Sequence, residues 1–436
     1  MPAAATNSRP RDSEPEGPQA LRWPLHSLGQ RIRFLAAGLL AVALYVGVVA
    51  ADYASKVLAG SLVAERVALA ARLDPLNAAY QHILGRISFY EQQDVPAAIQ
   101  HYSAAAHLNP YSARYWLDLA NVQQIDARVE DSRKALEHAL AADPTNPQVA
   151  NEAANYYLVL GDVPSALRLL ALVVRYSPED QRSAVELSWR ATQDAGAVMG
   201  QVLPQTTDSY LIFLHLLMAR RQTEAADQVW RALMDSKQNI APDSAFPYID
   251  YLLEQREAPR AWAAWQQLVR RQESMNRYPV AGNLVTNPGF EEDILNGGFG
   301  WRYESNPHVA LGVDQRDAYR GGRSLSVSFD GEAVRDAGIG QLLVVQPDTT
   351  YLLSAWARSE DIQGAGGPQL AVFDRYSGAR LYLSDELSGG QGWRKIEGEF
   401  HTPSDAQLVA LRMVRVPGTT RIRGRVWLDE VSVVRK

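Results

Sequence analysis

Four short phrases ending in proline set the spacing of the first half of this chain: Leu73-Asp74-Pro75, Leu108-Asn109-Pro110, Ala142-Asp143-Pro144 and Tyr176-Ser177-Pro178. The last three prolines are 34 residues apart, and the first precedes the second by 35. Proline ends a helix because it lacks the amide hydrogen that an interior helix bond needs. A fixed period of 34 residues is typical of a solenoid of helix pairs. The phrases therefore predict stacked helical repeats over residues 73–182.

The residues between these prolines keep the same spacing of small and bulky side chains. They are Ala98, Tyr102 and Ala105 before the second proline, Trp116, Leu119, Ala120, Ser132, Leu136 and Ala139 before the third, and Ala153, Ala154, Tyr157, Gly161, Ala166, Leu170 and Val173 before the fourth. This pattern resembles the tetratricopeptide repeat (TPR), although the third repeat departs from it at the tryptophan and glycine positions. The resemblance implies an all-α solenoid whose neighbouring repeats form an extended concave surface that binds a protein partner.

Four amide side chains are the candidate residues for that protein-binding surface. Asn121 and Asn155 lie 34 residues apart, close in sequence to Gln124 and Asn151. Amides there can hydrogen-bond an extended peptide backbone, whereas the alternative is that they are solvated helix positions. The TPR class that clamps a chaperone's terminal carboxylate uses lysines that this groove lacks, which argues against such a partner.

An uncharged segment precedes the repeats. Residues 1–33 are rich in proline, serine and charged residues and are predicted to be a disordered cytoplasmic tail. Phe34–Ala51 carries no charge over 18 residues, roughly 27 Å of helix, which predicts a transmembrane helix. A buried core helix and a cleaved signal peptide are the alternatives. Because Arg22, Arg31 and Arg33 precede it, we predict a single-pass protein of the inner (cytoplasmic) membrane with its N-terminus in the cytoplasm and the bulk of the chain periplasmic or extracytoplasmic.

Length and composition limit the number of domains and the kinds of site that the chain can have. The chain has 436 residues, a net charge of −6 and no cysteine, so two or three domains are expected and disulfides and thiolate metal sites are excluded. The mild acidity argues against nucleic acid as a partner. Helical spacing continues to about residue 275, with helix pairs predicted at Tyr210–Leu217 with Ala225–Leu233 and at Tyr248–Leu253 with Ala261–Leu268. The solenoid is thus predicted over 52–275.

From Asn283 the pattern changes to alternating strands separated by glycine, aspartate and proline turns. The predicted strands are Ser324–Phe329, Gly340–Val345, Tyr351–Arg358, Gln369–Phe373, Arg394–Phe400, Leu408–Val414 and Arg425–Val434. This spacing predicts an all-β sandwich over 283–436. The whole chain is therefore predicted to be multidomain: a transmembrane helix, an all-α solenoid and a β-sandwich.

Several phrases of the last region, taken in order, resemble the family 4/9 carbohydrate-binding modules, which are galactose-binding-like jelly rolls. The phrases are Asn283–Glu291 (NLVTNPGFE), Gly297–Trp301 (GGFGW), Tyr319–Leu325 (YRGGRSL), Thr349–Arg358 (TTYLLSAWAR), Gly392–Arg394 (GWR) and Val426–Val433 (VWLDEVSV). The resemblance implies a glycan cleft on one sheet face, where an aromatic ring stacks on a sugar and amides or arginines bond its hydroxyls.

Alternation on the strand Tyr351–Arg358 nominates the cleft residues. Tyr351, Leu353, Ala355 and Ala357 share one face, which is predicted to be core, and Trp356 and Arg358 share the other. The predicted carbohydrate-binding residues are Trp356, Arg358, Gln341, Gln369, Tyr376 and Tyr382; the alternative is that Trp356 covers the sandwich edge and Arg358 is solvated. Trp301, Trp393 and Trp427 are predicted to be core.

The same family often holds a structural calcium ion, and this resemblance implies ligands among Glu291, Glu292, Asp314 and Asp429. Carboxylate oxygens are ligands that Ca²⁺ prefers. No nucleotide-binding, zinc-protease or serine-hydrolase motif is present, and the scattered histidines of the repeats are interpreted as helix-surface residues. We therefore predict a non-catalytic, membrane-anchored adaptor suited to cell-surface polysaccharide assembly or export. A pure protein scaffold and an accessory subunit of a polysaccharide-processing enzyme are the alternatives.

Overall fold

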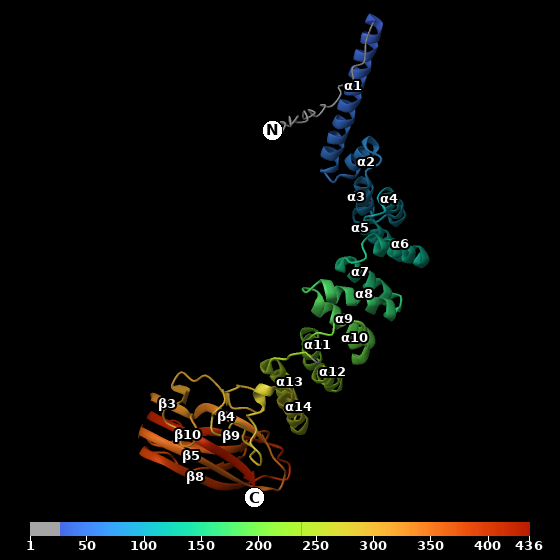
Figure 1. The fold of residues 1–436 in the computed structure, drawn as a ribbon. Coiled ribbons are helices and arrows are strands. Elements are labelled where there is room, and N and C mark those ends of the chain that lie inside the picture. The colour runs from blue at the N-terminus through green and yellow to red at the C-terminus, as the bar shows by residue number, and fades with distance from the viewer. Residues whose placement is uncertain (1–26, 237) are drawn as a thin grey trace, which may run out of the picture. The chain divides into compact units, whose positions relative to one another are not determined.

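The computed structural model describes residues 27–236 and 238–436 of the chain (Figure 1). Most of the predicted tail, residues 1–26, lies outside the described residues. Backbone contacts divide the chain into two compact units, Met1–Ala153 and Ala154–Lys436.

The first helix, α1 (Leu28–Ala59), contains the predicted transmembrane segment and extends beyond it at both ends. Ser27 caps its first turn together with Gln30, so residues 28–33 of the predicted tail are helical. In the described part of the chain this is the one helix long and apolar enough to cross a membrane, a test that signal sequences also pass. Its last turns are packed: Ala59 belongs to an apolar core with residues of the next helices, and Ser55 hydrogen-bonds Tyr80 at 3.0 Å.

The rest of the first unit consists of short helices in antiparallel pairs. They are α2 (Ala64–Leu73), α3 (Ala78–Arg86) with the π-helical turn η1 (Ile87–Glu91), α4 (Val95–Leu108), α5 (Ala113–Ile125), α6 (Val129–Ala142) and the first part of α7 (Pro147–Val159). Small residues allow the paired helices to approach: a methyl group on Gly85 would lie 2.6 Å from the Tyr102 ring, and the Ser132 hydroxyl donates to the Ala120 carbonyl at 2.5 Å. These contacts are those that the repeat pattern requires.

The second unit continues with helices and ends in strands. Its helices are the end of α7, α8 (Val163–Tyr176), α9 (Gln181–Thr192), α10 (Ala195–Gln201), α11 (Thr207–Ala219), α12 (Thr223–Asp235), α13 (Pro242–Glu254), α14 (Ala258–Arg271) and the 3-10 turn η2 (Glu273–Met275). Both predicted helix pairs are confirmed as α11 with α12 and α13 with α14.

The strands form a sandwich of two five-stranded antiparallel sheets, as predicted. Sheet A has the order β1 (Arg302–Tyr303), β4 (Asp336–Val344), β9 (Leu408–Arg415), β6 (Pro368–Asp374) and β7 (Arg380–Leu383). Sheet B has the order β2 (Val309–Asp314), β3 (Ser324–Ala333), β10 (Arg421–Arg435), β5 (Thr350–Gln363) and β8 (Gly389–His401). All seven predicted strands are present, and β1, β2 and β7 are additional.

The sandwich core follows the predicted alternation. Tyr351, Leu353, Ala355 and Ala357 on β5 are buried in it and the residues between them are not. Trp301 and Trp427 are buried as predicted. The prediction for Trp393 was wrong: it is only partly buried, because it lies on β8, the edge strand of sheet B, with its ring centre 6.0 Å from that of Tyr319 and not in the core.

The sandwich packs directly on α13 and α14. A methyl group on Gly297 would lie 2.2 Å from the Phe246 ring, and one on Gly298 2.3 Å from the Trp265 ring. Arg302 of β1 forms an ion pair with Asp250 of α13. The last helix pair therefore forms one wall beside sheet A.

Candidate functional site

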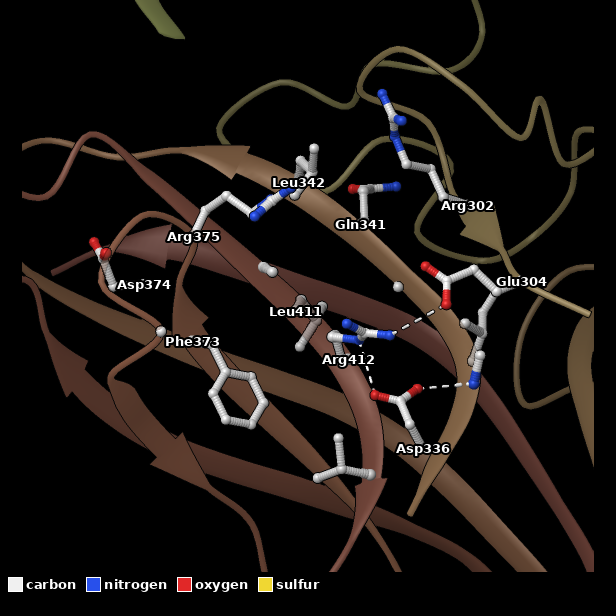
Figure 2. A pocket seen from close by; sticks show the side chains of 16 residues that line it. Arg302, Glu304, Asp336, Gln341, Leu342, Phe373, Asp374, Arg375, Leu411 and Arg412 are labelled. Carbon is white, nitrogen blue, oxygen red and sulfur yellow. Dashed lines mark hydrogen bonds and ion pairs between the residues drawn. The ribbon is translucent and has the colours of Figure 1, made fainter. Parts of the chain in front are cut away.

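A cavity of about 480 Å³ lies on the outer face of sheet A. Its floor comes from β4, β9 and β6, and the β6–β7 turn and β1 form its rim. Gly340 in this floor leaves no room for a side chain, since a methyl group there would lie 2.6 Å from the Leu411 carbonyl oxygen. The lining combines apolar and charged groups (Figure 2), namely Leu342, Phe373, Arg302, Glu304, Asp336, Arg375 and Arg412.

Arg412 on β9 organises the charges of this cavity. Its Nε atom lies 2.9 Å from Asp336 Oδ2, and its Nη2 atom lies 3.9 Å from Glu304 Oε2 (Figure 2). The other oxygen of Asp336 accepts a hydrogen bond from the Gly338 amide at 2.8 Å. Burial raises the pKa of Asp336 despite these partners, since desolvation disfavours its charged form. The cavity thus presents hydrogen-bond donors and acceptors in a fixed arrangement.

A second cavity, about 340 Å³, lies between α13 and the β6–β7 turn. It shares Arg302, Leu342 and Arg375 with the first cavity. The Tyr376 hydroxyl donates to the Leu253 carbonyl at 3.2 Å, and the Arg256 guanidinium lies 5.3 Å from the centre of the Tyr376 ring. The two cavities therefore adjoin along one line of side chains.

The predicted amide ligands serve the fold. Gln341 borders the first cavity but is 1% exposed, and its amide exchanges two hydrogen bonds of 2.9 Å with the Thr286 backbone. Gln369 is also buried; it donates to the Ser384 carbonyl at 2.7 Å and accepts from the Val416 amide at 3.2 Å. Both amides are therefore occupied by backbone partners.

Trp356 and Arg358 lie on sheet B, away from both cavity linings. Trp356 stacks on Tyr319 with ring centres 3.7 Å apart, and Arg358 covers the Trp427 ring at 4.7 Å and pairs with Asp317. Tyr382 packs against Gly398 of β8, and Tyr376 lines the second cavity. The six predicted residues are therefore not brought together.

The charged residues of the first cavity were missed by the sequence reasoning. Arg412 alternates with core residues on a strand that was predicted, so the same face argument as for β5 would have found it. Arg302 and Glu304 had no such signal, because β1 is only two residues long.

Two of the four predicted calcium ligands approach each other. Glu291 and Asp429 both lie within 3.7 Å of the position of a methyl group on Gly289. Glu291 accepts from the Gly322 amide at 2.8 Å and Asp429 from the Tyr319 amide at 2.8 Å. Glu292 lies 3.9 Å from Arg277, and Asp314 accepts the indole hydrogen of Trp427 at 2.9 Å. Among the described residues no group of three or more histidine or carboxylate side chains is suited to hold a metal, so a calcium ion here would need backbone oxygens besides Glu291 and Asp429.

The predicted groove amides lie on α5 and α7. Asn121 and Asn155 are exposed, and Gln124 and Asn151 are partly buried. Each is a side chain of the first helix of a predicted repeat, as the spacing required.

An ionic network that the sequence analysis did not predict connects α3, α5 and α7 in the first unit. Asp118 accepts hydrogen bonds from Arg114 at 2.7 Å and pairs with His82 at 2.6 Å, and Arg114 reaches Glu152 at 3.2 Å. The interpretation of His82 as a surface residue was therefore wrong, since its side chain is 15% exposed.

Comparison with known proteins finds a family match for most of the sandwich. Residues 282–414 match the family model for the carbohydrate binding domain of families 4 and 9. No curated protein sequence matches the chain significantly.

Among solved structures, the chain is similar to a family 4 carbohydrate-binding module (15% identity, TM-score 0.28, covering 35% of this chain and 99% of that one). It is also similar to the CBM22-1 xylan-binding domain of Paenibacillus barcinonensis Xyn10C (19%, 0.25, 34% and 90%). The TPR2B domain of yeast Sti1, in a pHsp70 complex, is a further similar structure (19%, 0.25, 27% and 96%). Residues 282–414 therefore match a carbohydrate-binding domain, and the helix pairs that precede them form a TPR-like stack.

Proposed function

We propose that this chain is a membrane-anchored adaptor that binds a glycan on sheet A and a protein partner along its helical repeats. The observation that carries the glycan site is the cavity of about 480 Å³ on the outer face of sheet A, in a domain that matches a carbohydrate-binding family. Arg412, Asp336 and Glu304 supply donors and acceptors for sugar hydroxyls, and Phe373 and Leu342 supply apolar surface for the C–H face of a ring.

The protein partner is proposed to bind along the first helices of the repeats, where Asn121, Gln124, Asn151 and Asn155 lie. A TPR-like stack forms an extended surface suited to a peptide segment. With α1 as a retained anchor and the bulk of the chain outside the cytoplasm, the two binding functions would suit polysaccharide assembly or export at the cell surface. The proposed role is binding rather than catalysis.

The test uses the full chain purified in detergent, first on a glycan array and then by calorimetry, with xylan oligosaccharides among the probes. We expect Phe373→Ala and Arg412→Ala each to weaken binding roughly 10-fold or more, since each removes a contact or a charged hydrogen bond. Arg423→Ala is the matched control, because Arg423 is exposed on β10 of sheet B. A folded protein that binds no glycan, or binding that both cavity variants leave intact, would refute the glycan site.

One observation favours a second function, that of a protein scaffold. Phe373 is the single aromatic residue among the described residues that line the first cavity, whereas small-molecule sites are usually lined with several aromatic side chains. In the scaffold alternative the sandwich binds protein. The glycan experiment separates the two, and a pull-down with the chain as bait that is abolished by Phe373→Ala would support the scaffold.

We also propose that Glu291 and Asp429 hold a calcium ion. Asp429 is fully buried, and burial raises its pKa although backbone amides donate to it, so a divalent cation there would offset the cost of its charge. We expect 1 mM calcium (about this concentration suits extracellular sites) to raise the unfolding temperature of the native chain and to leave that of Asp429→Asn unchanged. Equal melting curves with calcium and with chelator would contradict this site.

A further inference from the structure

The side chains that line the second cavity carry a net positive charge, whereas the charges that line the first cavity balance. Three arginines and two carboxylates line the second cavity, namely Arg256, Arg302, Arg375, Asp250 and Glu254. Arg302 is neutralised by Asp250. Within residues 27–236 and 238–436, neither Arg256 nor Arg375 has a carboxylate at ion-pair distance, and both are exposed. The junction of α13 with the sandwich therefore presents two guanidinium groups that form no ion pair among the described residues, beside the single remaining carboxylate of Glu254.

Arg256 lies over the ring of Tyr376, and Arg375 is the residue that precedes Tyr376 in the β6–β7 turn. Asp374 fixes the β6–β7 turn, accepting from the Tyr376 amide at 3.0 Å, and the Arg375 amide donates to the Leu408 carbonyl at 2.9 Å. Tyr376 is tied to α13 through Leu253, and the Arg256 guanidinium lies over its ring. Burial raises the pKa of the Tyr376 phenol. The positive charges of Arg375 and Arg256 oppose that shift, and the negative charges of Asp374 and Glu257 add to it.

Arg375 also connects the two cavities. It lines the first cavity together with Leu342 (Figure 2), and it lines the second together with Tyr376. A ligand that runs along sheet A past Leu342 would therefore reach Arg375 and then the surface of α13. Guanidinium groups bind carboxylates through paired hydrogen bonds, and the Tyr376 ring offers an apolar platform beside them.

We propose that the glycan site continues from sheet A onto α13, and that Arg375 and Arg256 bind a carboxylate-bearing sugar residue, such as a hexuronate, against Tyr376. The proposal rests on the proposed glycan-binding function and specifies its substrate class as acidic glycans. It also makes the last helix pair part of the sugar site, because Arg256 belongs to the turn after α13.

The experiment compares acidic glycans with neutral forms of the same backbone. The probes are polygalacturonate, alginate, hyaluronan and glucuronoxylan, each beside its carboxyl-reduced form, with the full chain in detergent. We expect at least one acidic glycan to bind roughly 10-fold or more tightly than its reduced form, with a preference that weakens as salt rises. Arg375→Ala should reduce that preference to less than about 3-fold. Arg380→Ala, an exposed arginine of β7 in the same hairpin that lines neither cavity, should retain it.

The outcomes distinguish the two levels of the proposal. Equal binding of acidic and reduced glycans, abolished by Phe373→Ala, would overturn the acidic subsite and leave the glycan site of sheet A standing. An acidic preference that survives in the Arg256→Ala/Arg375→Ala double variant would also overturn the subsite. Absence of binding to every probe by a folded chain would overturn both. The three arginines changed here, Arg256, Arg375 and Arg380, are exposed, so each variant is checked for an unchanged melting curve.

Discussion

At the residue scale, the carboxylate of Asp118 is the centre of the polar interior of the first unit. The residue is 8% exposed, and its two oxygens meet Arg114 and His82 from α5 and α3. A buried carboxylate is tolerated when charged or polar groups satisfy it, and losing one partner of such a group leaves the others unsatisfied. The network therefore holds neighbouring helices in register.

We predict that Asp118→Ala lowers the free energy of unfolding by about 1–3 kcal/mol, because it leaves His82 and the inner side of Arg114 without their acceptor. Denaturant titration followed by circular dichroism at the helical band measures this. Glu152→Ala is the control: its side chain is 40% exposed, so its ion pair with Arg114 should contribute less than about 1 kcal/mol. Equal losses in the two variants would contradict the assigned role of Asp118.

The lowered pKa values of two histidines predict how the stability of the chain depends on pH. Burial lowers the pKa of His101, and burial together with the charge of Arg182 lowers that of His215, relative to 6.5. At pH values between the lowered pKa of each folded-state histidine and 6.5, the unfolded chain binds more protons than the folded chain. This contribution to stability is therefore present above pH 6.5 and is lost as the pH falls below it.

We expect the unfolding temperature to fall between about pH 7 and pH 5, and to fall less in the double variant His101→Gln/His215→Gln. The difference between the two curves is the measured quantity, because the raised pKa values of Asp336 and Asp429 act in the opposite direction in both proteins. Parallel curves of unfolding temperature against pH for the two proteins would contradict the lowered pKa values of these histidines.

At the scale of elements, the contact between the sandwich and the last helix pair depends on two glycines. Gly297 and Gly298 leave room for the rings of Phe246 and Trp265, and Gly298 adopts a φ of +56°, which is strained for other residues. The same contact positions Arg302 and Tyr376 against α13. It therefore decides whether the second cavity exists.

We predict that Gly297→Ala loosens this contact at a cost of about 1–3 kcal/mol, the usual range for overpacking. Limited proteolysis should then cut faster within residues 272–283. The affinity for acidic glycans should fall more than the affinity for neutral glycans, which bind at the first cavity alone. Gly312→Ala on β2 is the matched control, since its nearest neighbour would be 3.7 Å from the added methyl group. Unchanged cleavage in Gly297→Ala would count against the contact.

At the scale of the whole molecule, α1 is long and apolar enough to cross a membrane, a test that a signal sequence also passes. The helix has 32 residues, about 48 Å, so it exceeds the bilayer core of about 30 Å. Its last turns pack with α2, and its Ser55 hydrogen-bonds Tyr80 of α3. A retained anchor would therefore present the repeats directly at the membrane surface.

We predict that the native chain fractionates with membranes and resists extraction at high salt, and that deletion of residues 28–51 releases it. Protease added to the outer side of intact spheroplasts should digest the repeats and the sandwich. A mature N-terminus close to Ala51, found by mass spectrometry, would show instead that the segment is a cleaved signal peptide.

The amino-acid sequence by itself determined the helix pairs and seven of the ten strands, and on β5 the inner and outer faces. The 34-residue spacing of Pro110, Pro144 and Pro178 was enough to predict helix pairs, because helix ends and small-to-bulky packing depend on nearby residues. Alternation on β5 likewise placed Trp356 and Arg358 outside the core, as the structure shows.

Only the tertiary structure decided which outer face carries the cavities. Strand order places β4, β9 and β6 side by side, so Asp336 and Arg412 meet across 76 positions of sequence (412 − 336) and Arg375 reaches Tyr376 and α13. Alternation repeats on every strand and carries no information on strand order. The physical reason is that register between distant strands arises from the packing of the whole sandwich. Alternation could therefore orient Trp356 and Arg358 away from the core but could not show that the two cavities lie on the other sheet.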